Sequence, residues 1–323
     1  MSSRRFGCET ATSRVVPADG LRLHLLESGA PGRPALCFLH GGAAHAHWFD
    51  LVTPAFADRF HVVSLDQRGH GESDWPRPAA YATEDFAADL LTLMDRLGWR
   101  RMALVGHSMG GHNAMAFAGW HPDRVSALAI VDSRPALPPE RVNRMHERGR
   151  RPPRLHPSLE AAVRSFRLLP KETAADPAFL AHLARAGLAR RDGGFKYRFD
   201  PACYGARRPV DAWPLLPRVT APALVVRGER SPILPREMAE RMREVIPKAS
   251  VVEIAGAYHH LVLDDPAAFN AALSGFLAAD TGSSARSRPW PSRRSPGAPR
   301  RSRRPGRSTP RCRERSSSGS PTA

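Results

Sequence analysis

Residues 101–120 read RMALVGHSMGGHNAMAFAGW, and the fold of the chain can be worked out from this stretch. Its apolar residues 102–105 predict a strand, and the residues after the serine predict a helix. Between them lies Gly106-His107-Ser108-Met109-Gly110, a GxSxG turn in the strand-to-helix context of a nucleophile elbow. Such a turn is tight, so Ser108 must adopt strained backbone angles, and only small neighbours let strand and helix pass. We therefore expect a serine hydroxyl that stands clear of a sheet.

The regions on both sides of this stretch alternate short runs of Val, Leu and Ile with helical patterns. Such runs predict further strands at 21–27, 35–39, 61–65, 127–131, 223–227 and 251–254. The clearest helix is 84–97, with its apolar residues on one face, and helices also follow Pro235 and Asp265-Pro266. This alternation predicts the α/β class, with a mainly parallel, doubly wound sheet.

The alternation stops between residues 134 and 216. Proline is frequent in this segment, and only short helices, at 159–169 and 178–190, are expected. We interpret the segment as a helical lid inserted between two strands and call it the insertion, while residues 1–133 and 217–280 form the core. An insertion at this point lies over the carboxyl ends of the strands, where open α/β sheets bind ligands.

The net charge of +17 is concentrated at the C-terminal end of the chain. Residues 281–323 contain twelve Arg and one Glu, so they carry +11 of this charge. This tail is dense in Ser, Pro, Gly and Arg and lacks apolar periodicity, so we predict that it is disordered. One interpretation is an electrostatic tether to nucleic acid or an anionic membrane, and the other, which we favour, is an incidental extension.

The cysteines and the lengths of the apolar runs indicate the cellular compartment. Four cysteines, at 8, 37, 203 and 312, are too scattered for a disulfide framework or a zinc site, so we expect free thiols. No run approaches the roughly 18 apolar residues of a membrane span, and the N-terminus lacks the apolar region of a signal peptide. We therefore expect a cytoplasmic protein.

Three further segments match a known pattern. They are His40-Gly41-Gly42 after the run 35–39, DQRGHGESD at 66–74, and GAYHH at 256–260 before Asp265-Pro266. Together with the elbow, and in this order along the chain, they resemble the α/β-hydrolase superfamily over roughly residues 15–280. The resemblance implies the α/β-hydrolase fold and a covalent mechanism through Ser108.

A serine nucleophile needs a base within hydrogen-bond reach and a carboxylate that orients the base. The resemblance places the base in the loop 256–260, and the spacing to Pro266 favours His259. His260 is the alternative base; otherwise it is expected to face the sheet or the insertion. We expect His40 and His107 to support their loops rather than to transfer protons.

The acid is where this sequence departs from the commoner family pattern. That pattern reads Gly-x-x-Asp after the strand 223–227, whereas this chain reads Gly228-Glu229-Arg230-Ser231. A subset of the family carries its acid after the preceding strand, which here ends in Asp132. We assign Asp132 as the acid and keep Glu229 in reserve; the other role open to Asp132 is to cap the start of the insertion.

The resemblance also implies an oxyanion hole made of two backbone amides, those of Gly42 and Met109. Trp48 and Phe49 follow the Gly42 loop, and we predict that they line the substrate pocket, with a place in the core as the alternative. The charges of the segment 66–74 are expected to organise the loop beside the site rather than to act in catalysis.

The arginines of the insertion also have two interpretations. They are Arg141, Arg144, Arg148, Arg150, Arg151 and Arg154. They would suit an anionic substrate, but we favour a solvated surface, which is the commoner role of such residues.

The residue at position 108 limits the reaction class. Dehalogenases and epoxide hydrolases of this fold use a carboxylate nucleophile, so a serine disfavours both. The chain has no dinucleotide fingerprint, P-loop or HExxH sequence, so we expect no cofactor and no metal. We predict a serine hydrolase that cleaves a small, largely apolar carboxylic ester through an acyl-enzyme on Ser108. The alternatives are a carbon–carbon bond hydrolase or a haloperoxidase-like perhydrolase with the same triad, or a non-enzymatic protein that binds a ligand or nucleic acid.

Overall fold

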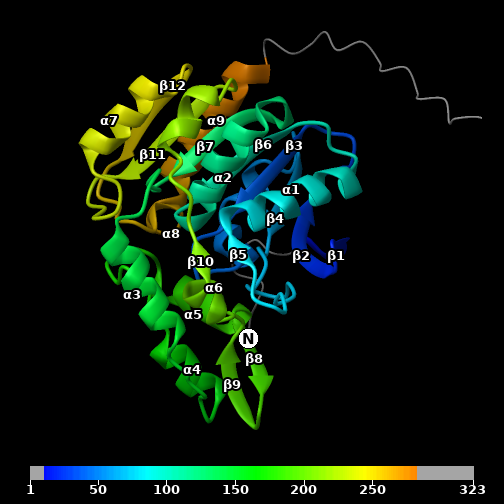
Figure 1. Cartoon of the computed structure of the whole chain (residues 1–323), viewed down its shortest axis with the longest axis vertical. Helices are drawn as coiled ribbons and strands as arrows, with labels where there is room; N and C mark the ends of the chain where they lie inside the picture. Colours follow the sequence, from blue (N-terminus) through cyan, green and yellow to red (C-terminus); the bar gives the residue numbers. More distant parts are fainter. Residues whose placement is uncertain (1–10, 282–323) are drawn as a thin grey trace, which may run out of the picture. The chain divides into compact units, whose positions relative to one another are not determined.

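The structure, a computed structural model, describes residues 11–281, and an eight-stranded sheet lies at its centre (Figure 1). The strand order is β1-β2-β4-β3-β6-β7-β11-β12. The bounds are β1 Thr12–Ala18, β2 Leu21–Ser28, β3 Ala35–Leu39, β4 His61–Leu65, β6 Met102–His107, β7 Val125–Val131, β11 Ala223–Gly228 and β12 Ala249–Ile254. From β4 to β12 in this order, each strand pairs in parallel with its neighbour. Strand β2 pairs antiparallel with both β1 and β4. The predicted mainly parallel α/β sheet is confirmed.

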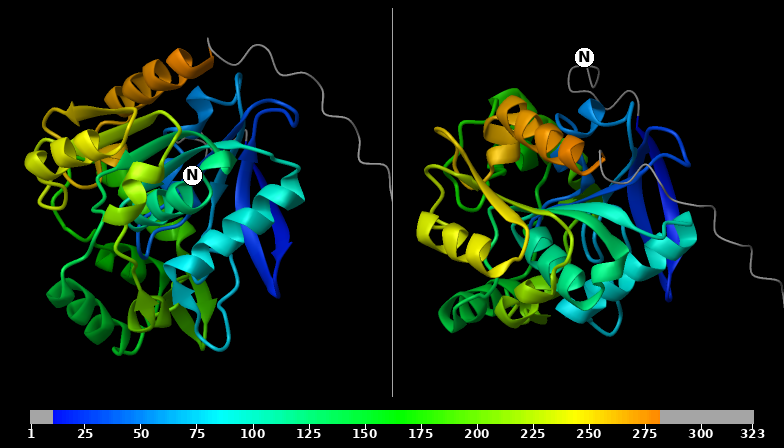
Figure 2. Two further views of the ribbon diagram at one scale, coloured as in Figure 1. Left: turned by 45° about the horizontal axis from the view of Figure 1, so that its top comes forward. Right: turned by 90° about the horizontal axis from the view of Figure 1, so that it is seen from above.

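Helices cover both faces of this sheet. They are α1 Thr83–Leu97, α2 Met109–Trp120, α7 Arg236–Val245, α8 Leu261–Asp264 and α9 Pro266–Thr281. Figure 2 shows α9, in orange, on one side of the sheet, and α1, α2 and α7 on the other. Because side chains alternate along a strand, Cys37 and Leu39 of β3 join one buried cluster while Leu36 and Phe38 join the other. Covering both faces explains why these strands read as continuous apolar runs.

Strand β1 is the strand of the central sheet that the apolar runs did not reveal. It is an edge strand, paired along its whole length with β2 from Thr12↔Glu27 to Ala18↔Leu21. Its first four residues are exposed, and only Val16 and Ala18 are buried. An edge strand with one solvated face alternates apolar and polar residues, so it lacks the continuous run that marks the central strands.

The insertion joins β7 to β11. Its elements are α3 Pro139–Gly149, α4 Leu159–Ser165, α5 Pro177–Ala186, β8 Leu188–Arg191, β9 Gly194–Tyr197, α6 Ala202–Gly205, β10 Arg207–Arg208 and the 3-10 helix η6 Trp213–Arg218. The insertion contains helices, as expected, but also three short strands that the sequence did not reveal. Strands β8 and β9 form an antiparallel hairpin whose turn, Asp192-Gly193, has positive φ at both residues, and β10 pairs with β5 (Tyr81–Ala82). These strands are only two to four residues long, so they are too short to form a recognisable apolar run.

Some expectations fall on the ends of the chain. The predicted disordered tail, from residue 282 onward, lies outside the described residues, as do Cys8 and Cys312. Cys37 and Cys203 are buried free thiols. Between residues 11 and 281, none of the helices combines the length and the apolar character that crossing a bilayer requires.

Candidate active site

Ser108 lies at the turn between β6 and α2. Its φ of 55° and ψ of −115° confirm the strained backbone that the elbow predicts. A Cβ atom on Gly106 would lie 2.3 Å from the carbonyl oxygen of Gly110, and one on Gly110 would lie 2.3 Å from that of Leu39. The close approach of α2 to the sheet therefore requires both glycines.

Two other segments bring a base and a carboxylate to this serine. In the loop after β12, the Nε2 atom of His259 lies 3.1 Å from Oγ of Ser108. The Nδ1 atom of His259 lies 2.6 Å from Oδ2 of Asp132, which follows β7. Because a carboxylate only accepts, Nδ1–H donates to Asp132, and the lone pair on Nε2 can accept the hydroxyl proton of Ser108. The geometry is that of a nucleophile, a base and an orienting acid.

The Asp132 carboxylate is held by further donors. The hydroxyl of Ser231 donates to Oδ2, and the amide of Gly228 donates to Oδ1 at 3.4 Å. Burial acts to raise the pKa of Asp132, while the hydrogen bonds from Ser231 and Gly228 act in the opposite direction and favour the carboxylate form. Glu229, the reserve acid, is used elsewhere, because its carboxylate accepts the amide of Gly256 at 2.6 Å. The structure thus brings Asp132, and not Glu229, to the histidine.

The protonation state of His259 follows from its surroundings. Burial lowers the pKa of its imidazole to about 3, and the positive charge of Arg141 lowers it as well. The imidazole is therefore neutral at neutral pH, which is the form that a general base requires.

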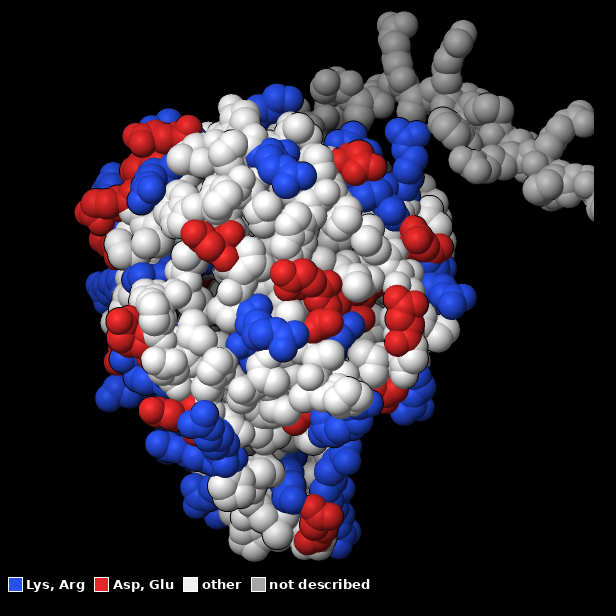
Figure 3. All heavy atoms as spheres, viewed as in Figure 1, with Lys and Arg blue, Asp and Glu red and all other residues white. Residues whose placement is uncertain are grey.

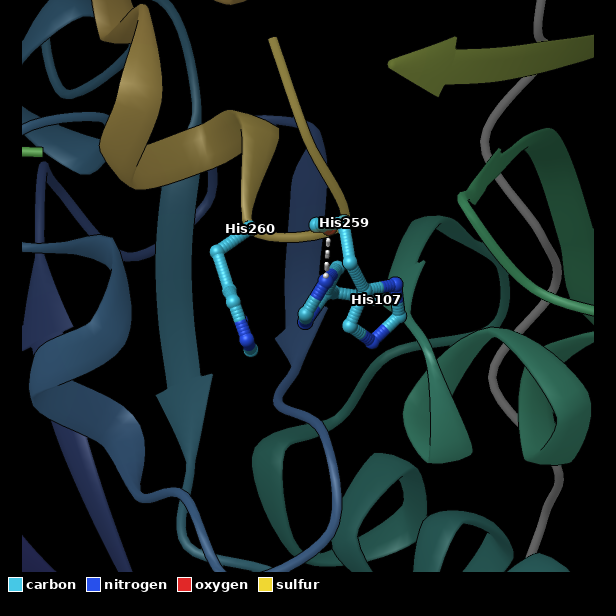
Figure 4. Close-up of side chains that lie close together, drawn as sticks. All are labelled: His107, His259 and His260. Atoms are coloured by element: carbon cyan, nitrogen blue, oxygen red, sulfur yellow. Dashed lines mark hydrogen bonds between the residues drawn. The ribbon is translucent and has the colours of Figure 1, made fainter. Parts of the chain in front are cut away.

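Two more imidazoles lie against His259 (Figure 4). His107 donates from Nε2 to the carbonyl oxygen of His259 at 2.9 Å, so it supports the backbone of the histidine loop. His260 donates from Nε2 to the carbonyl oxygen of Pro170 at 3.0 Å, so it faces the insertion. In the described structure, neither ring bonds to Ser108, and the contact of His259 with the serine is the one that matches a base.

His40 links the Gly42 loop to the segment 66–74. Its Nδ1–H donates to the carbonyl oxygen of Gly41 at 2.7 Å, and its Nε2 accepts the amide of Gln67 at 3.1 Å. Asp66 accepts the amides of Ala46 at 2.6 Å and Glu72 at 2.9 Å. These contacts give His40 and Asp66 supporting positions in the two loops beside the site.

The amides of Gly42 and Met109 belong to residues that line the cavity over Ser108. Met109 is the first residue of α2, so its N–H has no acceptor within the helix. Across residues 11–281, neither amide donates to a protein acceptor. The phenol of Tyr204 lies close by, since a Cβ atom on Gly42 would be 3.1 Å from its oxygen. Burial raises the pKa of Tyr204 to about 12, so the phenol keeps its proton at neutral pH.

The cavity over Ser108 has a volume of about 400 Å³ and is walled on one side by the insertion. Its lining includes the apolar side chains of Leu137, Met145, Leu169, Pro170 and Ile233. The lining also includes the arginines Arg134, Arg141, Arg144, Arg148 and Arg207. A cavity of this size suits a small molecule.

Trp48 and Phe49 do not line this cavity. They belong to the 3-10 helix η3 (Ala46–Phe49), and they are 4% and 0% exposed. The ring of Phe49 packs against that of Phe38 at 5.0 Å between centroids. Because η3 packs on β4, both rings turn inward to the apolar cluster. The prediction that these two residues line the pocket is therefore wrong, and their place is the core.

Several residues of the site were not identified from the sequence. Ser231 was noted only as the residue that replaces an acid, whereas its hydroxyl donates to Asp132. Tyr204 and Arg207 reach the cavity from the far end of the insertion. No local motif marks either of them, because their approach to Ser108 depends on how the insertion folds back over the sheet.

Among residues 11–281, two groups of side chains have the composition of a metal site. The first, His107, His259 and His260, belongs to the site above, and the nitrogens of His259 already contact Ser108 and Asp132. A metal on His259 would remove the base from the serine, so we assign none there.

The second group joins η3 to α5. His47 and His182 lie 2.9 and 2.8 Å from the same oxygen of Asp50. Burial acts to raise the pKa of Asp50, but the hydrogen bonds from His182 and His47 outweigh it, so the pKa is lowered. These hydrogen bonds explain why the three side chains lie together: they form a polar contact between the core and the insertion.

The order of the strands, the strained elbow and the serine–histidine–aspartate contacts together define an α/β-hydrolase architecture. The family model described as "alpha/beta hydrolase fold" matches residues 34–266. The chain belongs to the α/β-hydrolase family.

Individual relatives are hydrolases of the same fold. The chain is 28% identical over 282 residues to 2-(acetamidomethylene)succinate hydrolase of Mesorhizobium japonicum, covering 82% of this chain and 95% of the relative. It is 32% identical over 269 residues to N-formylmaleamate deformylase of Pseudomonas putida, covering 81% and 95%. A crystal structure of E-2-(acetamidomethylene)succinate hydrolase aligns with a TM-score of 0.74 and 27% identity, covering 83% of this chain and 99% of that chain.

Proposed function

We propose that the protein is a serine hydrolase that cleaves a small carboxylic ester through an acyl-enzyme on Ser108. The observation that carries this proposal is the continuous contact from Ser108 to His259 at 3.1 Å and from His259 to Asp132 at 2.6 Å. A serine hydroxyl is a weak nucleophile until an adjacent base accepts its proton, and this contact supplies that base.

In the first half of the reaction, Oγ of Ser108 attacks the ester carbonyl carbon and its proton passes to Nε2 of His259. The imidazolium that forms is stabilised by the carboxylate of Asp132, which accepts its Nδ1–H. Collapse of the tetrahedral intermediate breaks the bond to the leaving oxygen, and the Nε2 proton transfers to the departing alcohol. The products of this half are the alcohol and an acyl-enzyme.

The negative charge of the tetrahedral oxygen requires donors that are in place before the reaction. We assign this role to the amides of Gly42 and Met109, two residues that line the cavity and whose amides have no protein acceptor in the described part of the chain. One such donor contributes about 3 kcal/mol to transition-state stabilisation. Because amides act here, the side chain at position 109 has little direct effect on this step.

In the second half, water attacks the acyl carbon while His259 accepts its proton, and the acid product leaves as Ser108 regains a hydrogen. The names of the relatives, a succinate hydrolase and a deformylase, support hydrolysis as the reaction class. They do not distinguish an ester from the carbon–carbon and perhydrolase alternatives. The lining of the cavity combines apolar side chains with arginines.

The test uses 4-nitrophenyl acetate and butyrate, with a fluorophosphonate probe as a second readout. We expect turnover and covalent labelling of the wild-type protein, and the loss of both in Ser108→Ala. The matched control is Ser250→Ala, an exposed serine of β12, which should behave as wild type. Labelling that persists in Ser108→Ala would contradict the proposal.

A further inference from the structure

The cavity over Ser108 is strongly cationic. Five arginines line it, whereas its one acidic residue, Asp132, is already bound by His259 and Ser231. Figure 3 shows Lys and Arg side chains gathered over the lower part of the molecule, where the elements of the insertion lie in Figure 1. The cavity therefore presents positive charge that no acidic group in its lining balances.

Three of the five arginines come from one face of α3. Arg141, Arg144 and Arg148 are spaced by three and four residues, and Met145 of the same face also lines the cavity. Residues at this spacing share one side of a helix. Arg150 and Arg151 follow the helix, are exposed and do not contribute to the lining. Arg144 and Arg148 are exposed as well, so the arginines of α3 differ from Arg150 and Arg151 in lining the cavity and not in being buried.

The arginines of the cavity lack counter-ions inside the protein. Between residues 11 and 281, none of the five forms an ion pair, although ten other arginines in that range do. Arg68 is a matched example, because it is 7% exposed and donates two bonds to Asp89, at 2.6 and 2.7 Å. A charge removed from water normally acquires such a partner, and among the five this argument applies most strongly to Arg207, which is buried, and not to Arg144 and Arg148, which are exposed.

Arg207 is the most buried of the five, at 3% exposed. Its guanidinium donates to the carbonyl oxygen of Tyr81 at 3.1 Å and to Oδ1 of Asn113 at 2.6 Å, and both acceptors are neutral. Burial lowers the pKa of Arg207 to about 10. The pKa of Arg141 is lowered by burial and by the charges of Arg134 and Arg144. An anion in the cavity would compensate for the burial of the Arg207 charge and for the repulsion of Arg141 by its neighbouring arginines.

We propose that the substrate carries an anionic group, a carboxylate or a phosphate, in addition to the acyl group that Ser108 attacks, and that Arg207 and the arginine face of α3 bind it. The inference rests on the proposed function, because it names the substrate class of the same site. The planar guanidinium matches both anions, since it can donate two parallel N–H bonds to one carboxylate or phosphate. The volume of about 400 Å³ restricts the substrate to a small molecule.

The kinetic test compares esters that differ in charge and not in the scissile bond. They are the 4-nitrophenyl monoester of glutarate, its neutral methyl ester, and the 4-nitrophenyl ester of 3-phosphonopropionate. We expect a kcat/KM for at least one anionic ester about 10-fold or more above that of the neutral ester. The two anionic esters distinguish the carboxylate from the phosphate source.

The variants are Arg141→Gln and Arg144→Gln, with Arg150→Gln as the matched control. The loss of one hydrogen bond to a charged group lowers affinity by roughly 10- to 100-fold. Each cavity variant should therefore lower kcat/KM for the preferred anionic ester by about that factor. In both cavity variants, the ratio of kcat/KM for the anionic ester to kcat/KM for the neutral ester should fall. In Arg150→Gln this ratio should stay unchanged. An equal ratio in all four proteins would overturn the inference while leaving the serine hydrolase intact.

A binding measurement separates the inference from the hydrolysis itself. The Ser108→Ala protein is titrated calorimetrically with glutarate, 3-phosphonopropionate and neutral dimethyl glutarate. Tighter binding of either anion, weakened by Arg141→Gln and not by Arg150→Gln, supports the inference even if no ester is cleaved. Binding of neither anion above the neutral diester overturns it.

Discussion

Replacing Asp132 by Asn tests the orienting role of the carboxylate, because it removes the charge and keeps the shape. In the wild-type protein, Oδ2 of Asp132 accepts Nδ1–H of His259 at 2.6 Å. An Asn amide that donates to Nδ1 moves the imidazole proton to Nε2, which lies 3.1 Å from Oγ of Ser108. A protonated Nε2 cannot accept the hydroxyl proton. We therefore expect kcat to fall by about 10⁴-fold, or about 5.5 kcal/mol.

The assay is steady-state hydrolysis of 4-nitrophenyl butyrate at pH 8, with thermal unfolding measured in parallel. We expect Asp132→Asn to unfold like the wild type, since burial disfavours the charge that the change removes. Glu229→Gln is the matched control and should lose less than about 3-fold, because Glu229 contacts Gly256 and not His259. More than a tenth of wild-type activity in folded Asp132→Asn would refute the reasoning. So would a larger loss in Glu229→Gln.

Two other predictions follow from the elbow and from the base. Gly110→Ala would place a Cβ atom 2.3 Å from the carbonyl oxygen of Leu39, so it should lower the free energy of unfolding in urea by about 3 kcal/mol or more. Gly275→Ala, where nothing lies within 4 Å, should be neutral or stabilising, and equal effects would contradict the steric argument. The lowered pKa of His259 predicts that kcat/KM falls on the acid side with a midpoint below 6.5, because protonation removes the base. In Arg141→Gln this midpoint should move upward, since a charge that disfavours the imidazolium is lost, and a downward shift would contradict the argument.

The predictability of the strands depended on where each strand lies in the sheet. The central strands β3 and β4 were predicted with the bounds that the structure has, because both of their faces are buried and their sequences are mostly apolar. The edge strand β1 and the hairpin β8–β9 were missed, because their exposed residues dilute the pattern. The helices α1, α7 and α9 were predicted from apolar spacing and from acidic or proline residues at their starts.

The residues of the candidate site also divide into those that the sequence located correctly and those that it did not. Ser108 and His259 lie in segments with recognisable local sequences, and the structure brings both together. Trp48 and Phe49 were assigned to the pocket because they follow the Gly42 loop along the chain, but η3 turns their rings into the core. Distance along the chain does not show which side of a short helix faces the cavity.

The sequence by itself determined the order of the central strands and of the helices that follow them, the glycine-flanked turn at Ser108 and the histidine loop. These features depend on contacts between near neighbours, where side-chain periodicity and the steric limits of a turn operate. Only the tertiary structure decided that Asp132 and not Glu229 reaches His259, and that α3 turns its arginines toward the cavity. Both depend on how distant segments pack, and packing is set by the shape of the whole core.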